Sequence, residues 1–460
     1  MKVKNYIIFI LLLLALMSIQ VTGSEEIRAA DILSRISNGE NICEYQKIIV
    51  NDLDLSKIKD PITGKIEIKA SVFEGSVNLA GKTFEEEVNF SGTTFREDVN
   101  LFEPGKNATF KKNLCFNGAN FKDDANFIEV SFDNAANFDS ARFNGRTNFK
   151  TARFGKGADF DDAQFDEYVS FSGANFSSGH VTFQNTKFEK DAYFYTSKFR
   201  SGIDNSGIDF SNAQFGGKAY FRQADFSDEV NFRGSYFLRN ADFRNVNFGD
   251  DAVFEYAYFN EDALFDGANF SGKLNLNGSR FDRIQLSWRD IKGSDKLVYN
   301  DEVYLHLIES YRSQGRYSDA DECYYRYRVL RASDLSGVQK GLDYLANILY
   351  GYGVKPTYPI RMSVAVILGF TLCYRLIGSR AKLKSELKCV SKKPLRCTLK
   401  RSLWFSLKVF LSGTKPFSSD LVDFSKIDKK YKDLALLERF LGMLLFILFL
   451  ITITNTVIIK

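Results

Sequence analysis

The chain of 460 residues carries 61 Lys and Arg against 57 Asp and Glu, a net charge of +4, and charged residues make up 26 % of it. This balance excludes a long disordered acidic or basic chain. Only 2 His leave little material for a His-based catalytic or metal site, and the 6 Cys form neither a disulfide framework nor a CxxC pair. The unusual count is 44 Phe, beside 32 Gly and 6 Pro.

Residues 1–23 have the composition of a secretory signal peptide. Two lysines start the segment, an apolar run from Tyr6 to Met17 follows, and Val-Thr-Gly closes it. An uncleaved signal anchor fits the same residues, and both interpretations mark the chain for export. Cleavage would leave the following segment outside the cytoplasm.

Residues 24–61 are predicted to form an N-terminal helix and cap. Ser24 to Gly39 has apolar residues at helical spacing, and its final glycine is a suitable stop. Because the open end of a β-structure can template aggregation, we expect this helix to cover the first strands of the domain that follows.

Internal periodicity dominates residues 62–291. Apolar residues recur from Ile68 to Leu286 in alternating steps of 5 and 6, and 34 of the 40 positions are Phe. Small or β-branched residues are common two positions before them, and both sets are predicted to point inward. The clearest run of this structural ladder is Phe121, Phe127, Phe132, Phe138, Phe143, Phe149, Phe154 and Phe160.

The 11-residue period does not predict a helix. It can indicate a right-handed coiled coil, but steps of 5 and 6 place successive Phe on nearly opposite sides of a helix. The sustained alternation of an ordinary strand is also missing. A chain that turns a corner every 5 or 6 residues fits the pattern, which is interrupted by an insertion at 103–106, a one-residue slip at 177–179 and the polar Asn205.

The segments 119–121, 158–160 and 268–270 read Ala-Asn-Phe, Ala-Asp-Phe and Ala-Asn-Phe. They resemble pentapeptide repeats of the form A(D/N)(L/F)xx. The resemblance implies a β-solenoid, a right-handed quadrilateral parallel β-helix with four faces per coil. Forty positions then make about ten coils, roughly 48 Å long at about 4.8 Å per strand. Stacked coils would bury each other's Phe side chains, which one coil cannot do alone.

Charge argues against nucleic acid as a partner of the repeat region. Residues 62–291 carry 26 Lys and Arg against 34 Asp and Glu. Nucleic-acid binding would require a basic patch, and the region is too mildly acidic to mimic DNA as some pentapeptide-repeat proteins do. We predict no catalytic residue, no metal site and no cofactor.

A glycan-active β-helix enzyme is a further alternative. The acidic pairs at 123–124, 161–162 and 250–251 could line one face. Asp is locally favoured at turns, however, so corners and solubility explain these pairs better. His180 falls at the slip, has no second His or Cys near it in the sequence, and is interpreted as a tolerated irregularity.

Residues 292–358 are predicted to form a helical hairpin adapter. Asp301 to Arg331 looks like a single tetratricopeptide-type hairpin, which is too little for a peptide groove, so a cap and spacer role is favoured. Gly-Tyr-Gly at 351–353 and Pro356 then break the chain before the membrane.

Residues 359–460 are predicted to be a two-helix membrane domain. Leu436 to Ile459 is long enough to cross about 30 Å of hydrocarbon, and Met362 to Gly378 is a shorter second candidate. From Arg375 to Asp433 there are 16 Lys and Arg against 5 Asp and Glu, so the positive-inside rule places this loop in the cytoplasm. The cleaved signal places residues 24–358 outside, and the two inferences agree.

The apolar segment Leu403 to Gly413 is too short to span a membrane and is expected to be re-entrant or interfacial. Its place between two helices resembles the pore helix of two-helix ion channels, with Trp404, Phe405, Gly413 and Thr414 as the pore-like residues. Some pentapeptide-repeat membrane proteins of archaea and bacteria carry such a C-terminus. A potassium filter needs a TVGYG-like run, whereas this chain reads Ser-Gly-Thr-Lys-Pro-Phe, and the charge-derived topology is the reverse of a channel's.

The sequence thus predicts a non-enzymatic pentapeptide-repeat protein anchored in the cell membrane, with an extracytoplasmic repeat domain that serves as a binding or scaffold element. Its expected partners are the membrane and a protein or surface glycan, without nucleic acid, and the chain could form a homo-oligomer. The alternative is a divergent two-transmembrane channel-like subunit without a potassium filter.

Overall fold

The computed structural model describes residues 25–177, 179–200, 207–291, 296–378, 394–414, 422, 424 and 429–458. The chain divides into two compact units, Met1–Val303 and Tyr304–Lys460, which we call the solenoid and the helical unit. The predicted signal segment and Asn205 lie outside the described residues.

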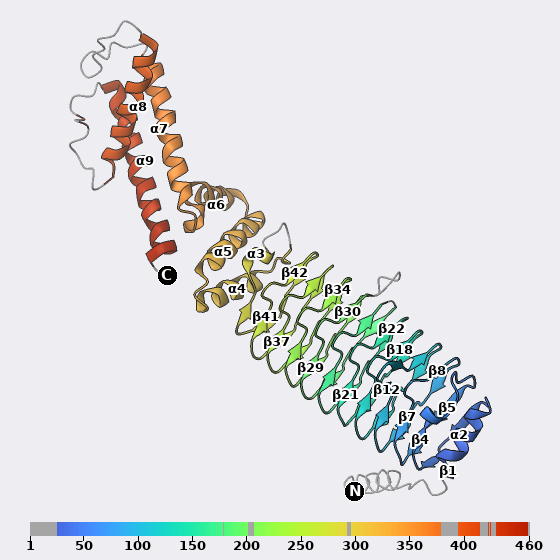
Figure 1. The fold of residues 1–460 in the computed structure, drawn as a ribbon. Helices are drawn as coiled ribbons and strands as arrows, with labels where there is room; N and C mark the ends of the chain where they lie inside the picture. The colour runs from blue at the N-terminus through green and yellow to red at the C-terminus, as the bar shows by residue number, and fades with distance from the viewer. Residues whose placement is uncertain are drawn as a thin grey trace, which may run out of the picture. The chain divides into compact units, whose positions relative to one another are not determined.

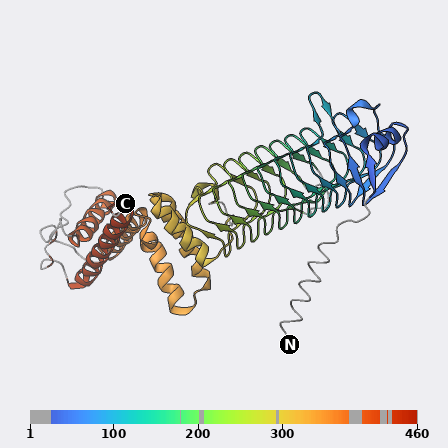
Figure 2. The same ribbon diagram turned by 90° about the horizontal axis from the view of Figure 1, so that it is seen from below.

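The solenoid is a stack of about 12 turns made of very short parallel strands (Figure 1; Figure 2), which confirms the predicted parallel β-solenoid. Its faces are four parallel sheets. A 12-stranded sheet runs from β1 (Glu26–Arg28) to β44 (Arg280–Phe281), an 11-stranded sheet from β2 (Ile42–Tyr45) to β43 (Leu274–Asn275), an 11-stranded sheet from β4 (Leu53–Asp54) to β45 (Ile284–Gln285), and a 9-stranded sheet from β8 (Thr83–Phe84) to β42 (Asn269–Phe270).

Equivalent residues of successive turns lie in register. Strand β16 (Asn120–Phe121) pairs with β20 (Arg142–Phe143), which pairs with β24 (Gln164–Phe165), so that Phe lies over Phe. Two of the 11-residue periods therefore make one turn, and every inward Phe is stacked on its own counterpart. Strands of only two residues can build these sheets, because backbone pairing is repeated from turn to turn and does not need to extend along each strand.

The stack begins before the Phe pattern does, so the prediction of about ten coils was too low. Strands β2, β3 (Ile48–Val50) and β4 pair in parallel with β5 (Ile66–Lys69), β6 (Val72–Phe73) and β7 (Val77–Asn78), respectively. Their inward residues are Ile and Leu at irregular spacing, which the search for a Phe period cannot detect.

A helix precedes these strands, within the predicted range of 24–61. Helix α2 (Ala29–Ser37) buries Ala29, Ile32 and Ile36, which lie on one face because they are three and four residues apart. It follows β1 and packs against β4 and β2. The helix thus covers the first turns.

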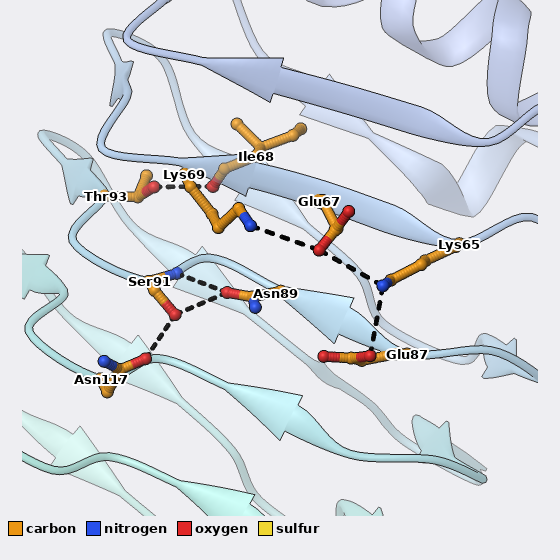
Figure 3. Close-up of polar contacts among 9 residues, drawn as sticks. All are labelled: Lys65, Glu67, Ile68, Lys69, Glu87, Asn89, Ser91, Thr93 and Asn117. Carbon is orange, nitrogen blue, oxygen red and sulfur yellow. Dashed lines mark hydrogen bonds and ion pairs between the residues drawn. The ribbon is translucent and has the colours of Figure 1, made fainter.

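Polar side chains tie neighbouring turns together, as the first turns show (Figure 3). On the outside, Nζ of Lys65, which directly precedes β5, bridges Glu67 of β5 and Glu87 of the next turn, each at 3.3 Å. Inside, the buried Thr93 hydroxyl donates to the carbonyl of Ile68 at 2.8 Å. The same hydroxyl-to-carbonyl bond recurs at Thr186, Ser197 and Ser235. An inward hydroxyl therefore costs little, because its hydrogen bond is satisfied.

Many corners place a residue with left-handed backbone two positions after an inward Phe. At one of them Ser140 has φ 56° and the Ala141 N–H donates to the Phe138 carbonyl at 3.0 Å, which is the pattern of a type II turn. Asn and Gly are favoured there, as at Asn185 and Gly173. The predicted insertion forms an antiparallel hairpin, β12 (Phe102–Glu103) with β13 (Lys106–Asn107).

Short helix α3 (Trp288–Ile291) follows the last strand of the solenoid. Helices α4 (Asp301–Ser313) and α5 (Tyr317–Arg331) occupy the segment for which two helices were expected. A third helix, α6 (Gly337–Tyr350), comes next and was not predicted. The 3-10 turn η4 (Gly351–Gly353) separates it from the remaining helices.

Those are α7 (Thr357–Gly378), α8 (Pro394–Ser412) and α9 (Lys429–Ile453), which continues as the π-helix η5 (Thr454–Ile458). The three pack against one another. Thr357–Leu376 and Lys432–Thr456 are long and apolar enough to cross a membrane. Their outer faces leave large apolar side chains uncovered: Leu368 is 51 % exposed and Phe440 is 54 % exposed.

Candidate functional site

The interior of the solenoid is filled by the predicted Phe ladder. The eight residues named for it are at most 1 % exposed. Rings one turn apart stack, as between Phe121 and Phe143 at 4.6 Å and between Phe138 and Phe160 at 4.9 Å. Neighbouring rows meet edge to face, as Phe127 and Phe138 do at 5.6 Å. Stacked and edge-to-face rings pack densely, so a ligand site has to be sought on the outer surface.

The acidic pairs of the turns are engaged in backbone hydrogen bonds. Asp123 accepts from the Asp124 N–H at 2.9 Å, and Asp124 accepts from the Arg146 N–H of the next turn at 2.8 Å. Asp250 and Asp251 repeat both bonds. In the part of the chain that the structure describes, no group of three His, Cys, Asp or Glu could hold a metal ion. These carboxylates therefore hold corners, which leaves them poorly suited to act as a pair of catalytic acids.

One hollow of the outer surface lies over the sheet that runs from β4 to β45. We call it the tyrosine groove; its volume is about 430 Å³ and its lining residues are Lys150, Tyr168, Ser170, Ser172, Tyr193 and Tyr195. It exists because an outward ladder of rings ends there. Tyr193 of β29 (Ala192–Tyr193) stacks on Tyr220 of β33 (Ala219–Tyr220) at 5.1 Å. The preceding outward residue, in β25 (Val169–Ser170), is only a serine.

The groove offers hydrogen-bond donors beside aromatic surface. Burial, with Tyr220 and Asp242 nearby, raises the pKa of Tyr195 to about 12, and burial beside Asp191 also raises the pKa of Tyr193. Both phenols are therefore protonated at neutral pH. The Tyr193 hydroxyl donates to Asp191 at 3.2 Å, and Lys150 adds a basic side chain to the lining. Such a surface suits a polar partner with a flat apolar face.

A second polar cluster lies inside the helical unit. Glu438 of α9 is fully buried, and its carboxyl group accepts hydrogen bonds from the Tyr374 hydroxyl of α7, at 2.7 Å, and from the Ser406 hydroxyl of α8. Ser406 Oγ also lies 2.9 Å from the Ile367 carbonyl. One side chain thus joins three helices. An ionisable residue in an apolar helix marks a functional hypothesis, with Tyr374 and Ser406 as its partners.

The four pore-like residues do not converge on one point. Trp404 is 60 % exposed, and Phe405 packs edge-on against Tyr374 at 5.0 Å. Gly413 lies so close to α9 that a Cβ would come within 2.2 Å of the Arg439 carbonyl oxygen. Thr414 is buried and bonds back to the Leu411 carbonyl at 2.8 Å.

The segment that carries these residues is longer than its apolar part. Helix α8 has 19 residues, because the polar and basic residues before Leu403 continue the same helix. It packs against both α7 and α9. Residues 415–420, which would follow a pore helix, lie outside the described residues.

Comparison with family models adds to this geometry. A model described as pentapeptide repeats (9 copies) matches residues 106–153, 127–175, 149–198 and 210–257. The matched residues all lie in the solenoid, which is therefore similar to pentapeptide repeats over residues 106–198 and 210–257. Such repeats form a fold that is typically structural or protein-binding and not catalytic. Comparisons with curated proteins and with solved structures find no match.

Sequence reasoning missed both clusters. The tyrosine groove had a signal, since Tyr193 and Tyr220 occupy equivalent outward positions in successive turns. The end of this outward tyrosine ladder is visible only from Ser170, which occupies the equivalent position one turn earlier and has no ring. Glu438 was visible as an interruption of an apolar run, but its partners are 32 and 64 residues away in the chain.

Proposed function

We propose that this protein is a non-enzymatic, membrane-anchored scaffold that holds a right-handed pentapeptide-repeat solenoid outside the cytoplasm. One observation carries the proposal and concerns the two helices that could cross a membrane. The rest of the protein buries only 17 % of the most apolar stretch of Thr357–Leu376 and 22 % of that of Lys432–Thr456. A core helix of a soluble protein would be mostly covered by the protein itself. Lipid would cover these faces instead.

The orientation rests on charge. The segment from Arg375 to Asp433 carries 16 Lys and Arg against 5 Asp and Glu, which favours the cytoplasmic side. Helices α7 and α9 run in opposite directions, since Tyr374 near the end of one meets Glu438 near the start of the other. A helix that enters and one that returns would leave the solenoid and the C-terminal end on the outer side.

The solenoid would act through its outer surface, because its interior is filled with Phe. The tyrosine groove is the place where we propose that a partner, a protein or a surface glycan, binds. Tyr and Ser supply rigid contact area and adaptable hydrogen bonds in recognition surfaces. Substituting Tyr193 by Ala should weaken such binding without unfolding the rod, because its side chain points outward.

Cysteine labelling tests the topology. One variant keeps Cys389 and Cys397 of the basic segment as the reactive cysteines. A matched variant keeps the exposed Cys43 of the solenoid in their place. Cys323 can stay in both, because burial raises the pKa of its thiol and suppresses its reactivity. A membrane-impermeant maleimide should label Cys43 in intact cells and the basic segment only after permeabilisation.

The reverse labelling pattern would place the solenoid inside and overturn the orientation. Recovery of the unlabelled protein in the soluble fraction after alkaline extraction of membranes would overturn the anchoring itself. Each result is distinct, so the two parts of the proposal can fail separately.

The alternative is a divergent channel-like subunit without a potassium filter. It is favoured by one arrangement, the packing of α8 against both candidate membrane helices around the buried Glu438. Ion flux into liposomes that contain the purified chain tests it. Flux that is lost in Glu438→Gln would support the alternative, whereas flux no greater than in empty liposomes would remove it.

A further inference from the structure

Helix α6 (Gly337–Tyr350) turns its polar face toward the protein. Asp343, only 7 % exposed, accepts hydrogen bonds from the Arg328 guanidinium and from the Tyr352 hydroxyl, both at 2.6 Å. Asn347, one turn further on the same face, accepts from the Tyr325 hydroxyl at 3.1 Å. The contacts of this face with α5 and η4 are thus hydrogen bonds and an ion pair between Arg328 and the buried Asp343.

The opposite face of α6 is apolar and uncovered. Val338 is 79 % exposed, Leu342 62 % and Leu345 51 %. Their spacing of i, i+4 and i+7 places them in one stripe along the helix. We call these three residues the α6 apolar face.

This arrangement is inverted relative to a water-soluble protein. There, an amphipathic helix buries its apolar stripe and leaves its polar residues in water. In α6 the polar residues are the ones that are held by the protein, while three aliphatic side chains in a row remain outside. An apolar stripe of this kind requires a covering surface.

The chain itself indicates what that surface is. Helix α6 ends at Tyr350, and the candidate membrane helix begins at Thr357, only a few residues later. The outer face of α7 carries its own exposed row, including Ile360 and Val364 near that end. α6 packs directly against α7 and α9. A bilayer that surrounds α7 therefore ends within reach of α6.

The turn between the two helices holds α6 in a defined direction. Gly351, Tyr352 and Gly353 have φ values of 56°, 55° and 82°, so the chain bends sharply there. Tyr352 is fixed in this unusual backbone by its bond to Asp343, and Arg328 lies over its ring at 4.5 Å. The α6 apolar face is thus presented by a rigid joint.

We infer that α6 is an interfacial helix whose apolar face lies in the headgroup–acyl boundary of the membrane that α7 enters. Helices with one apolar and one polar face lie in the interface plane, with the apolar side about 5–10 Å deep. The inference rests on the proposed membrane anchoring and adds a second contact, which would set the tilt of the helical unit against the bilayer.

Spin-label accessibility tests the inference on the full chain in phosphatidylcholine–phosphatidylglycerol vesicles. Single cysteines replace Leu342 of the apolar face, Lys340 as the matched control on another side of α6, and Leu368 as a reference within α7. The native cysteines are replaced, except the buried Cys323. All three sites are exposed, so labelling should not disturb folding.

We expect the label at Leu342→Cys to collide severalfold more often with oxygen, relative to a water-soluble nickel chelate, than the label at Lys340→Cys. Leu368→Cys should be deeper still. Equal chelate access at 342 and 340 would overturn the inference, and protection of 342 from both reagents would replace the bilayer by a protein partner or a second copy. Chelate access at Leu368→Cys would instead refute the anchoring, so the two failures are distinguishable.

Discussion

The two units of this protein place their apolar side chains in opposite ways. In the solenoid, Phe149 is fully buried between the rings of Phe127 and Phe171, at 4.6 and 4.9 Å. In the helical unit, Leu368 and Phe440 are about half exposed on the outer faces of α7 and α9. The solenoid satisfies the hydrophobic effect by itself, turn upon turn, whereas the anchor that we propose would rely on surrounding lipid. Apolar side chains can therefore build a rod in water or, as we propose, an anchor in lipid.

The largest effect is expected from the buried ladder. Phe149→Ala should lower the free energy of unfolding of the solenoid by about 3–5 kcal/mol, because it removes the ring between Phe127 and Phe171 and leaves a cavity. Urea unfolding followed by circular dichroism measures it. The matched control is Leu238→Ala, at a position that is 46 % exposed on the same rod. Equal losses at both positions would show that the ladder does not carry the stability.

The next effect concerns close packing in the helical unit. A Cβ at Gly442 would come within 2.4 Å of the Phe410 carbonyl oxygen, so Gly442→Ala should push α8 away from α9. We expect a loss of about 1–3 kcal/mol, as for other overpacked sites, measured as thermal unfolding in detergent. Gly369→Ala is the control, since nothing lies within 4 Å of a Cβ there. It should be neutral or stabilising by up to about 1 kcal/mol; a similar loss in both variants would contradict close packing as the cause.

The clamp that holds α6 should respond to acid. Burial by itself would raise the pKa of Asp343, but hydrogen bonds from Tyr352 and Arg328 outweigh burial, and the pKa lies below its ordinary value. A carboxyl group with a lowered folded pKa contributes stability above its unfolded pKa, and this is lost as the pH falls through the folded pKa. The helical unit should therefore lose stability below about pH 4.

Asp343→Asn should remove part of that acid sensitivity and cost about 1–3 kcal/mol at neutral pH, because it breaks a buried charged hydrogen bond. Thermal midpoints between pH 7 and pH 3 measure both effects. The exposed Asp334→Asn serves as the control. An unchanged pH profile in Asp343→Asn would show that another group causes the acid response.

The smallest effect is expected on the outside of the rod. Arg239 pairs with Glu261 of the next turn at 2.8 Å, and the two side chains are 61 % and 35 % exposed. Arg239→Ala should cost at most about 1 kcal/mol and less at high salt, because water and ions screen surface pairs. A double-mutant cycle with Glu261→Ala at two salt concentrations measures the coupling. A coupling free energy as large as the loss expected for Phe149→Ala would contradict the prediction that the buried ladder stabilises the solenoid more than its surface ion pairs do.

The regular parts of the fold were predictable because a residue-level pattern repeats them. Phe143 and Phe165 are equivalent in sequence and lie over each other in the structure. The first turns were missed because Ile49 and Leu53 fill the interior without that spacing. Helix α6 was not predicted. Its apolar stripe, which includes Val338 and Leu342, has the spacing of a helix, but the pattern does not tell whether protein or another phase covers that stripe.

The sequence by itself determined the repeat, the parallel solenoid and the two apolar helices, because each follows from spacing or length within one segment. Only the tertiary structure decided which residues meet across segments. The tyrosine groove exists because Ser170 and Tyr193 lie in adjacent turns. Glu438 finds Tyr374 and Ser406 through helix packing, and the α6 apolar face is outward because Asp343 is held inward. Such contacts depend on three-dimensional neighbours, which local periodicity does not encode.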